Sequence, residues 1–228
     1  MSSADIRFIP ASPWQVVLPH IAPLWNVEDC LKSMGDIAVP LLLVDNSPDS
    51  NTKQLQLPVN VEPVYHPQNL GVAGSWNLAL RRQAEFTLIV SASMRFRNGL
   101  AAFLEEAQAH MTEWGLGFYQ GLHLMVLTRA VVERVGWFDE HYYPAYFEDN
   151  DFWYRAVLSG LPKEPIQQVV TDQAFCIGNA LALRSGVSVA LGENEAYYKT
   201  KWGGLPWHET YSHPFNNPAY DYRYTGDA

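Results

Sequence analysis

The chain is organised around one stretch, Tyr146-Phe147-Glu148-Asp149-Asn150-Asp151-Phe152-Trp153-Tyr154-Arg155, in which three acidic residues occupy four consecutive positions between aromatic residues. Ser159-Gly160-Leu161-Pro162 follows, and Gly and Pro are typical of the end of a helix. We therefore predict a helix that begins at the acidic residues and ends before Gly160. Carboxylates are favoured at a helix N-terminus by the helix dipole and by free backbone N–H groups. The pattern alone therefore fits either a stable helix start or a functional site.

Upstream of this stretch, apolar runs typical of buried strands alternate with helical patterns. The predicted strands cover residues 14–19, 40–44, 59–65, 86–90 and 122–127, and the predicted helices cover residues 24–34, 78–83, 99–110 and 129–135. Asn26 with Asp29 predicts the start of the first helix, and Thr128 predicts the cap of the last. Strands that alternate with helices in this way form a mostly parallel sheet flanked by helices.

The C-terminal part has a different character. Ile166–Thr171 is predicted as a further strand, and residues 194–202 as a helix that Gly203 and Gly204 end. From Pro206 onward, Pro, His, Asn and Tyr predominate, which predicts an irregular tail. We expect one domain over residues 1–192, with residues 193–228 adding a helix and a tail that pack on it.

Composition narrows the class of protein. Hydrophobic residues make up 48% of the 228 residues, which is enough for a core, and 15 basic against 24 acidic residues give a net charge of −9. That charge disfavours duplex nucleic acid as a partner. Cys30 and Cys176 form neither a metal-ligand spacing nor a disulfide framework, which favours a reducing compartment. With no signal-peptide pattern and no apolar run long enough to cross a membrane, we expect a cytoplasmic protein without a membrane span.

Polar residues follow several of the predicted strands. His20 follows the first, Asp45 and Asn46 the second, and Ser91-Ala92-Ser93 the strand over 86–90. In an open parallel sheet the carboxyl ends of the strands are where ligands bind. Residues 66–77 are predicted as a loop before a helix, where Gly71 lets a phosphate approach the backbone.

Four segments occur in a fixed order along the chain. They are Val17-Leu18-Pro19, Val44-Asp45-Asn46-Ser47, Asn69-Leu70-Gly71-Val72-Ala73-Gly74-Ser75-Trp76-Asn77, and a run from Arg129 through Val135-Gly136-Trp137-Phe138-Asp139-Glu140 to Phe147-Glu148-Asp149-Asn150-Asp151 and Arg155. Together they resemble the GT-A glycosyltransferases, in particular the family 2-like, rhamnosyltransferase-type group. The resemblance implies an α/β GT-A fold with a mostly parallel central sheet flanked by helices.

The resemblance also implies a reaction. These enzymes transfer a sugar from a nucleotide-sugar donor to a hydroxyl with inversion, and the second acid of the pair, here Asp149, matches their general base, with Glu148 orienting it. Asp151 is expected either to bind acceptor hydroxyls or to cap the helix. The remaining matches imply a donor site that contains His20, Asp45, Asn46, Gly71, Asn77, Ser91 and Ser93.

The chain departs from the family where a metal is usually bound. Ser93 stands where the family carries a metal-binding Asp, and Asp172 stands near the position of a metal-binding His. Because hydroxyls are weak ligands for Mg²⁺ or Mn²⁺, we expect no cofactor and little or no metal dependence. The cations expected to face the phosphates or the acceptor instead are Arg95, Arg97, Lys199, Lys201 and His208, with residues 197–204 as a mobile lid.

Two other functions fit the same residues. One is a non-catalytic module on the GT-A fold that binds a nucleotide-sugar or a glycan, which the lost metal motif favours and the Glu148-Asp149 pair opposes. The other is a glycosyltransferase that acts on hydroxymethylated nucleobases. The acceptor stays open among a glycan, a lipid-linked glycan, a protein and a modified base.

Overall fold

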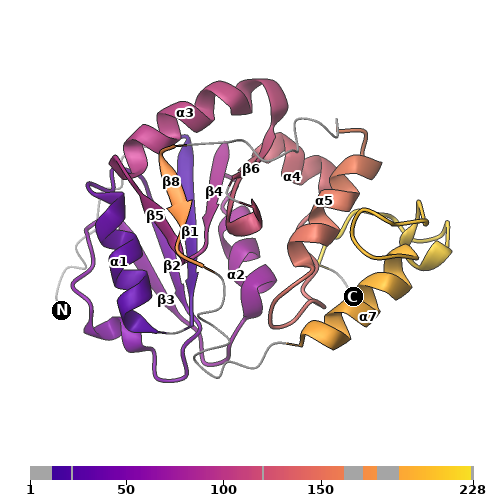
Figure 1. Cartoon of the computed structure of the whole chain (residues 1–228), viewed down its shortest axis with the longest axis horizontal. Helices are drawn as coiled ribbons and strands as arrows, with labels where there is room; N and C mark the ends of the chain where they lie inside the picture. Colours follow the sequence, from indigo (N-terminus) through magenta and orange to yellow (C-terminus); the bar gives the residue numbers. More distant parts are fainter. Residues whose placement is uncertain (1–11, 22, 120, 162–171, 179–189, 227–228) are drawn as a thin grey trace, which may run out of the picture.

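The computed structural model describes residues 12–21, 23–119, 121–161, 172–178 and 190–226. Its centre is a six-stranded sheet in the order β3-β2-β1-β4-β7-β6 (Figure 1). The strands are β1 (Trp14–His20), β2 (Leu41–Asp45), β3 (Val61–Tyr65), β4 (Phe86–Val90), β6 (Leu116–Tyr119) and β7 (Leu124–Thr128). The first four run parallel, whereas β7 is antiparallel to both β4 and β6. The predicted α/β class and mostly parallel sheet are confirmed.

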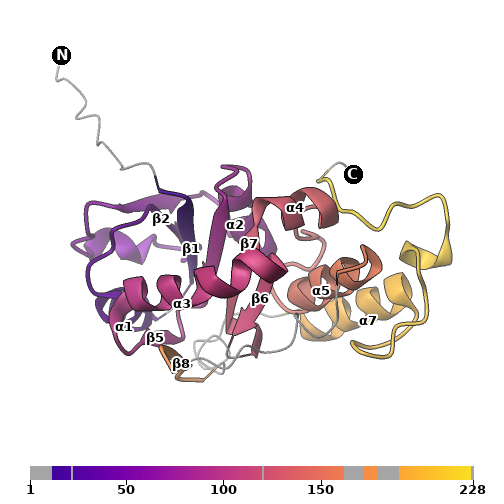
Figure 2. The same ribbon diagram turned by 90° about the horizontal axis from the view of Figure 1, so that it is seen from above.

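Helices cover both faces of the sheet (Figure 2). On one face, α1 (Leu24–Met34) and α3 (Gly99–Trp114) pack on strand residues such as Val16 and Leu18. On the other face, α2 (Gly71–Leu80), α4 (Arg129–Val135) and α5 (Glu148–Leu158) pack on alternate residues such as Val17. This alternation follows from the two-residue period of a strand, and burial on both faces explains why the strand sequences are continuously apolar.

Beyond α5 lies α7 (Leu191–Trp202), on the side of α5 away from the sheet in both views. It joins α5 through a separate cluster that contains Tyr142, Tyr198 and Trp202, all fully buried. The tail then continues from α7. The Trp137 N–H donates to Tyr224 O (2.7 Å), and a Cβ added at Gly136 would lie 2.3 Å from that oxygen. Only glycine at position 136 therefore lets the tail return to the domain in this way.

Several local predictions need correction. Asn26 does not cap α1, which begins at Leu24; it is buried in the helix, where its Oδ1 accepts from Arg95 Nη2 (2.9 Å). Residues 71–77 are not a loop but the first turns of α2. The Thr128 cap is confirmed, because its Oγ1 accepts from the Val131 N–H (3.3 Å).

The structure also contains strands that the sequence did not predict. A small antiparallel sheet of β5 (Met94–Phe96) and β8 (Ala174–Cys176) was not predicted, and neither was β6. Three short 3₁₀ helices complete the described elements: η1 (Asn51–Gln54), η2 (Gly121–His123) and η3 (Pro214–Asn216). The predicted strand Ile166–Thr171 lies outside the described residues. Among the helices that are described, none has both the length and the apolarity to cross a bilayer.

Candidate active site

The carboxyl edge of the sheet is joined to the start of α5 by a chain of contacts. Asn46, just after β2, donates through Nδ2 to Ser75 Oγ (2.9 Å) and accepts at Oδ1 from the Leu70 N–H (2.9 Å), which holds the first turn of α2. The Val72 N–H at that turn donates to Pro144 O (2.8 Å). Residues 143–147 then lead directly into α5, so the acidic pair is placed next to the edge where the parallel strands end.

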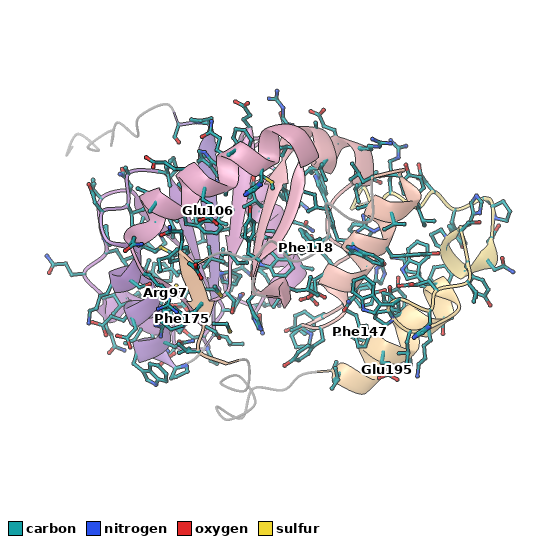
Figure 3. All side chains as sticks on the ribbon, turned by 45° about the horizontal axis from the view of Figure 1, so that its top comes forward. Arg97, Glu106, Phe118, Phe147, Phe175 and Glu195 are labelled. Carbon is teal, nitrogen blue, oxygen red and sulfur yellow. The ribbon has the colours of Figure 1, made fainter. Side chains whose placement is uncertain are left out.

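The entry into α5 has an unusual backbone. Tyr146 and Phe147 both have positive φ values, 80° and 75°, which non-glycine residues rarely adopt. Surrounding contacts hold them there: Asn194 Nδ2 from α7 donates to Tyr146 O (3.2 Å), and the Phe147 ring packs 5.5 Å from the ring of Tyr198. Figure 3 shows Phe147 beside α7, while Arg97 and Phe175 lie together at the small sheet. Strained residues that their surroundings hold in place often occur next to functional groups.

The two acids of the pair differ in environment. Glu148 is buried, and its Oε2 has no hydrogen-bond partner in the part of the chain that the structure describes. Burial, and then the neighbouring Asp149 charge, raise the pKa of Glu148 well above its usual range. Asp149 as a whole residue is partly exposed, but the surrounding protein desolvates its carboxyl group and raises the pKa to about 6, although the Asn150 N–H donates to its Oδ1 (2.7 Å). Burial thus favours the protonated form of Glu148, whereas Asp149, with a pKa of about 6, is mainly charged at neutral pH and can accept a proton.

His20 and Asp45 are register partners at the ends of β1 and β2. Both are buried, and both hold the turn that follows β2. Asp45 Oδ1 accepts from the Ser47 N–H (2.8 Å) and hydroxyl, and its Oδ2 accepts from the Thr52 N–H (2.9 Å) and hydroxyl (2.6 Å). Burial raises the pKa of Asp45, but these hydrogen bonds outweigh it and leave the pKa below its usual value.

His20 is fixed in a similar way. Its Nε2 bonds to Asn51 Oδ1 (2.8 Å), and burial lowers its pKa. The two side chains therefore shape the loop over residues 46–52. Whether either one touches a nucleotide stays a prediction.

Gly71 lies against the backbone of the segment that leads into α5. This residue has φ +69°, and a Cβ there would meet Pro144 O at 2.9 Å and the Tyr143 ring at 3.0 Å. On the Cβ side, the close approach that glycine permits is therefore to residues 143–144, and contact of Gly71 with a phosphate stays a prediction.

Asn77 is also a scaffold residue. Its Oδ1 accepts from the Phe138 N–H (2.9 Å), and its Nδ2 donates to Phe138 O (2.9 Å) and Glu140 Oε1 (2.8 Å). The side chain is 1% exposed and both of its Nδ2 protons are donated within the protein, so it fastens α2 to residues 138–140. Its expected contact with the donor substrate stays a prediction.

Ser91 and Ser93 form the turn between β4 and β5. The Ser93 N–H donates to Ser91 Oγ (3.3 Å), and Arg95 Nη1 donates to Ala92 O (2.9 Å) and Met94 O (2.8 Å). Two hydroxyls beside a guanidinium do not fit a hard divalent cation, which prefers several charged oxygens. No group of three or more His, Cys, Asp or Glu side chains suited to a metal occurs within the described residues. Arg97, also proposed for the phosphates, packs its guanidinium 4.7 Å from the centre of the Phe175 ring.

Asp151 and Lys201 occupy the core instead of a ligand surface. Asp151 is fully buried, with Arg155 Nε at 2.7 Å, Lys201 Nζ at 2.7 Å and Trp202 Nε1 at 2.8 Å. Lys201 is 5% exposed and also donates to Asp139 Oδ2 (2.7 Å). Burial opposes ionisation of Asp139, but the Lys201 charge and the hydrogen bonds from Lys201 and His141 together outweigh it and lower the pKa of Asp139 to about 2. These charges compensate one another, which corrects the expected ligand roles of Asp151 and Lys201.

The remaining cations lie along the far part of α7. Lys199 pairs with Glu195 one turn earlier on the exposed face, and His208 is exposed in the loop that follows. Lys201 and Trp202 both contact Asp151, so the end of α7 is held against α5 in this conformation. The predicted movement of residues 197–204 as a lid stays a prediction.

Comparisons with known proteins bear on the fold. No protein-family model matches the chain. A galactofuranosyl glycosyltransferase of Leishmania donovani is 29% identical over 85 residues, which are 36% of this chain and 20% of that protein. The chain thus matches about a fifth of the length of this relative.

Solved structures match more of the chain. The mannosyltransferase PcManGT of Pyrobaculum calidifontis, in complex with GDP-Man and Mn²⁺, has a TM-score of 0.50 at 16% identity over 72% of this chain and 56% of that chain. S. aureus TarS 1–349 has a TM-score of 0.51 at 15% identity, over 72% and 60% of the two chains. Its complex with UDP-GlcNAc gives 0.51 at 15% identity, over 74% and 60%. The fold is that of the GT-A glycosyltransferases. The predicted fold is thereby confirmed.

Sequence reasoning missed the partners of the buried charges. Asp139 was part of a matched motif, but no role was predicted for it, and Lys201 was expected at a surface. One signal pointed to the core: Lys201 lies on a helix among Tyr197, Tyr198 and Trp202, and a cation surrounded by large aromatic residues is often buried with an acidic partner.

Proposed function

We propose that this chain is an inverting glycosyltransferase that moves a sugar from a nucleotide-sugar donor to a hydroxyl acceptor. One observation carries the proposal: Asp149, a partly exposed residue with its carboxyl pKa raised to about 6, stands at the first turn of α5 beside the carboxyl edge of a GT-A sheet. Inverting transfer needs one base, within reach of the attacking hydroxyl, that is unprotonated at neutral pH. Asp149 meets the second requirement and is placed to meet the first.

In the proposed reaction, the acceptor oxygen attacks the anomeric carbon from the face opposite the leaving nucleoside diphosphate. The oxygen–carbon bond forms as the bond to the diphosphate oxygen breaks, and Asp149 takes the hydroxyl proton. Glu148 retains its own proton because burial disfavours its charged form. The pair therefore divides its roles, with Asp149 as the charged base and Glu148 as its neutral neighbour.

The donor is expected to lie across the carboxyl ends of β1, β2 and β4. The solved neighbours that hold GDP-Man and UDP-GlcNAc support a nucleotide-sugar as the donor class. In this chain, Asp45 and His20 would act by shaping the loop over residues 46–52, with Asp45 kept negative by its hydrogen bonds. That loop is the surface we assign to the nucleobase.

We further propose that transfer does not require a metal. The support is the Ser91-Ala92-Ser93 turn, whose hydroxyls are poor ligands for a hard cation. Arg95 lies at this turn, 11% exposed at its side chain, and brings positive charge to the place where the leaving diphosphate would gain negative charge. The measurement is turnover in excess chelator. Full loss that Mn²⁺ restores would contradict metal independence.

The function is tested with a panel of UDP-, GDP-, dTDP- and CMP-linked sugars. An active enzyme slowly hydrolyses its donor, so free sugar should appear with one donor, and binding of that donor should raise the melting temperature. Asp149→Asn should lower this rate by about 10²- to 10⁴-fold while the thermal shift persists. Asn150→Asp, which adds an acid at the next position, is the matched control and should keep the wild-type rate within about threefold.

A non-catalytic nucleotide-sugar-binding module is the second candidate, and the Ser91-Ala92-Ser93 turn favours it. The same panel separates the two functions. A binding module shows the thermal shift with a donor but releases no sugar, and Asp149→Asn then changes neither result.

A further inference from the structure

The loop after α7 presents one large aromatic ring to solvent. Trp207 is 65% exposed and has φ +74°, a backbone conformation that bulky residues rarely adopt. The loop is closed tightly: the Thr210 N–H donates to Trp202 O (3.0 Å), and a Cβ added at Gly204 would lie 2.0 Å from His208 O. Trp207 is therefore held on a compact loop in a strained conformation that keeps its indole at the surface.

The Trp207 ring is connected to the candidate base, Asp149, through Trp153 on α5. Asp149 and Trp153 are one turn apart on α5 and so share a face of the helix. Helical side chains lean toward the helix N-terminus, so Trp153 leans toward the turn of Asp149. The Trp207 ring packs on the Trp153 ring with centroids 4.1 Å apart. The ring planes are tilted by 53°. One turn of helix plus this ring contact places the exposed indole on the order of 10 Å from the Asp149 carboxylate.

We propose that Trp207 is a stacking platform for a carbohydrate acceptor, whose sugar ring lies on the indole while a hydroxyl further along the chain reaches Asp149. This inference rests on the proposed transferase function, which makes the neighbourhood of Asp149 the acceptor side. The apolar C–H face of a pyranose matches a flat aromatic ring, and the exposed His208 next to Trp207 offers hydrogen bonds to sugar hydroxyls.

Other acceptor classes fit this surface less well. A net charge of −9 disfavours a polyanionic acceptor. A stable protein interface needs about 800 Å² on each partner, whereas this loop exposes two large apolar side chains, Leu205 and Trp207, beside polar neighbours such as His208 and Thr210. A neutral glycan needs only a ring of this size with polar groups around it.

Three variants of Trp207 separate stacking from packing. Trp207→Ala removes the ring, Trp207→Leu keeps an apolar cover over Trp153, and Trp207→Phe keeps an aromatic face. Trp25→Ala is the matched control, since Trp25 is 47% exposed on α1. The full chain is applied to an array of neutral oligosaccharides that end in galactose, glucose, mannose or GlcNAc, and binding of any captured glycan is then measured in solution by saturation-transfer NMR.

The expected result is that wild type, Trp207→Phe and Trp25→Ala bind the same glycan, while Trp207→Ala and Trp207→Leu bind it about three- to tenfold more weakly. Equal binding by wild type and Trp207→Ala would overturn the proposal, and so would capture of no glycan at all. A dimer in sedimentation velocity that Trp207→Ala dissociates would assign the ring to a second copy of the chain and also overturn it.

The outcomes for this inference and for the proposed function are distinct. Glycan binding through Trp207 by a protein that turns over no donor would uphold the platform and reject the transferase. Transfer to a glycan with an acceptor KM that Trp207→Ala leaves unchanged would uphold the transferase and reject the platform.

Discussion

Lys201 on α7 reaches Asp151 on α5 with 2.7 Å between Nζ and Oδ1, and both side chains are buried. The same ammonium group also contacts Asp139, so one cation serves two acids that belong to different segments. This contact joins the C-terminal helix to the helix that begins with the acidic pair. It therefore connects the stability of the C-terminal part to the position of Asp149.

Lys201→Met should destabilise the fold by about 3–5 kcal/mol, because it leaves two buried carboxylates without their shared cation. The measurement is the free energy of urea unfolding at neutral pH. Lys199→Met is the matched control: Lys199 pairs with Glu195 on the exposed face of the same helix, and its loss should cost less than about 1 kcal/mol. Similar unfolding midpoints for the two variants would contradict the buried network.

Turnover should depend on the ionisation of Asp149. Its pKa is raised to about 6, so the charged base predominates above that pH and is lost below it. We expect kcat/KM to be level near pH 7 and to fall about tenfold per pH unit below about pH 6. Circular dichroism across the same range shows whether the fold persists. An acid limb centred near pH 4, the range of an ordinary aspartate, would speak against burial of this group.

Glu148→Gln should stabilise the fold at alkaline pH. The folded pKa of Glu148 is raised above the unfolded value of 4.5, so its contribution to stability is present below that value and declines as pH rises through the folded pKa. Glutamine has a similar shape and carries no charge. The variant should therefore have a free energy of unfolding higher than that of wild type by on the order of 1–3 kcal/mol at pH 8, and this difference should disappear at pH 4. Equal stability of the two proteins at pH 8 would mean that Glu148 is not held neutral.

Gly71 and Gly74, both in α2, should respond in opposite ways to alanine. Gly71→Ala meets the Pro144 carbonyl and requires a left-handed residue, so it should cost about 1–3 kcal/mol and disturb turnover through residues 143–147. Gly74→Ala meets only ordinary contacts at 3.4 Å or more and improves helix propensity, so it should be neutral or stabilising by up to about 1 kcal/mol. Thermal unfolding measures both. Tolerance of alanine at Gly71 would show that the 143–144 backbone does not approach it closely.

The sequence predicted the secondary structure of a segment where the interactions that stabilise it are local, and failed where they are long-range. The strands and most helices followed from local patterns, because apolar runs, caps and glycine stops act within a few residues. The small sheet of β5 and β8 did not, since each strand has only three residues and gains its stability from a partner far along the chain. The antiparallel direction of β7 is likewise a property of the pairing, which no local pattern in Leu124–Thr128 encodes.

Within the candidate site, the sequence alone determined the order of strands and helices and the presence of an acidic pair at a helix start, because short-range periodicity and helix-end preferences produce both. Only the tertiary structure decided the solvent exposure and the charged partners of each acid. Asp149 and Asp151 are neighbours of the same type on one helix, yet one is partly exposed with a raised pKa and the other is buried against Arg155 and Lys201. Burial and nearby charge set the ionisation of a carboxyl group, and both arise from residues that meet it only when the chain is folded.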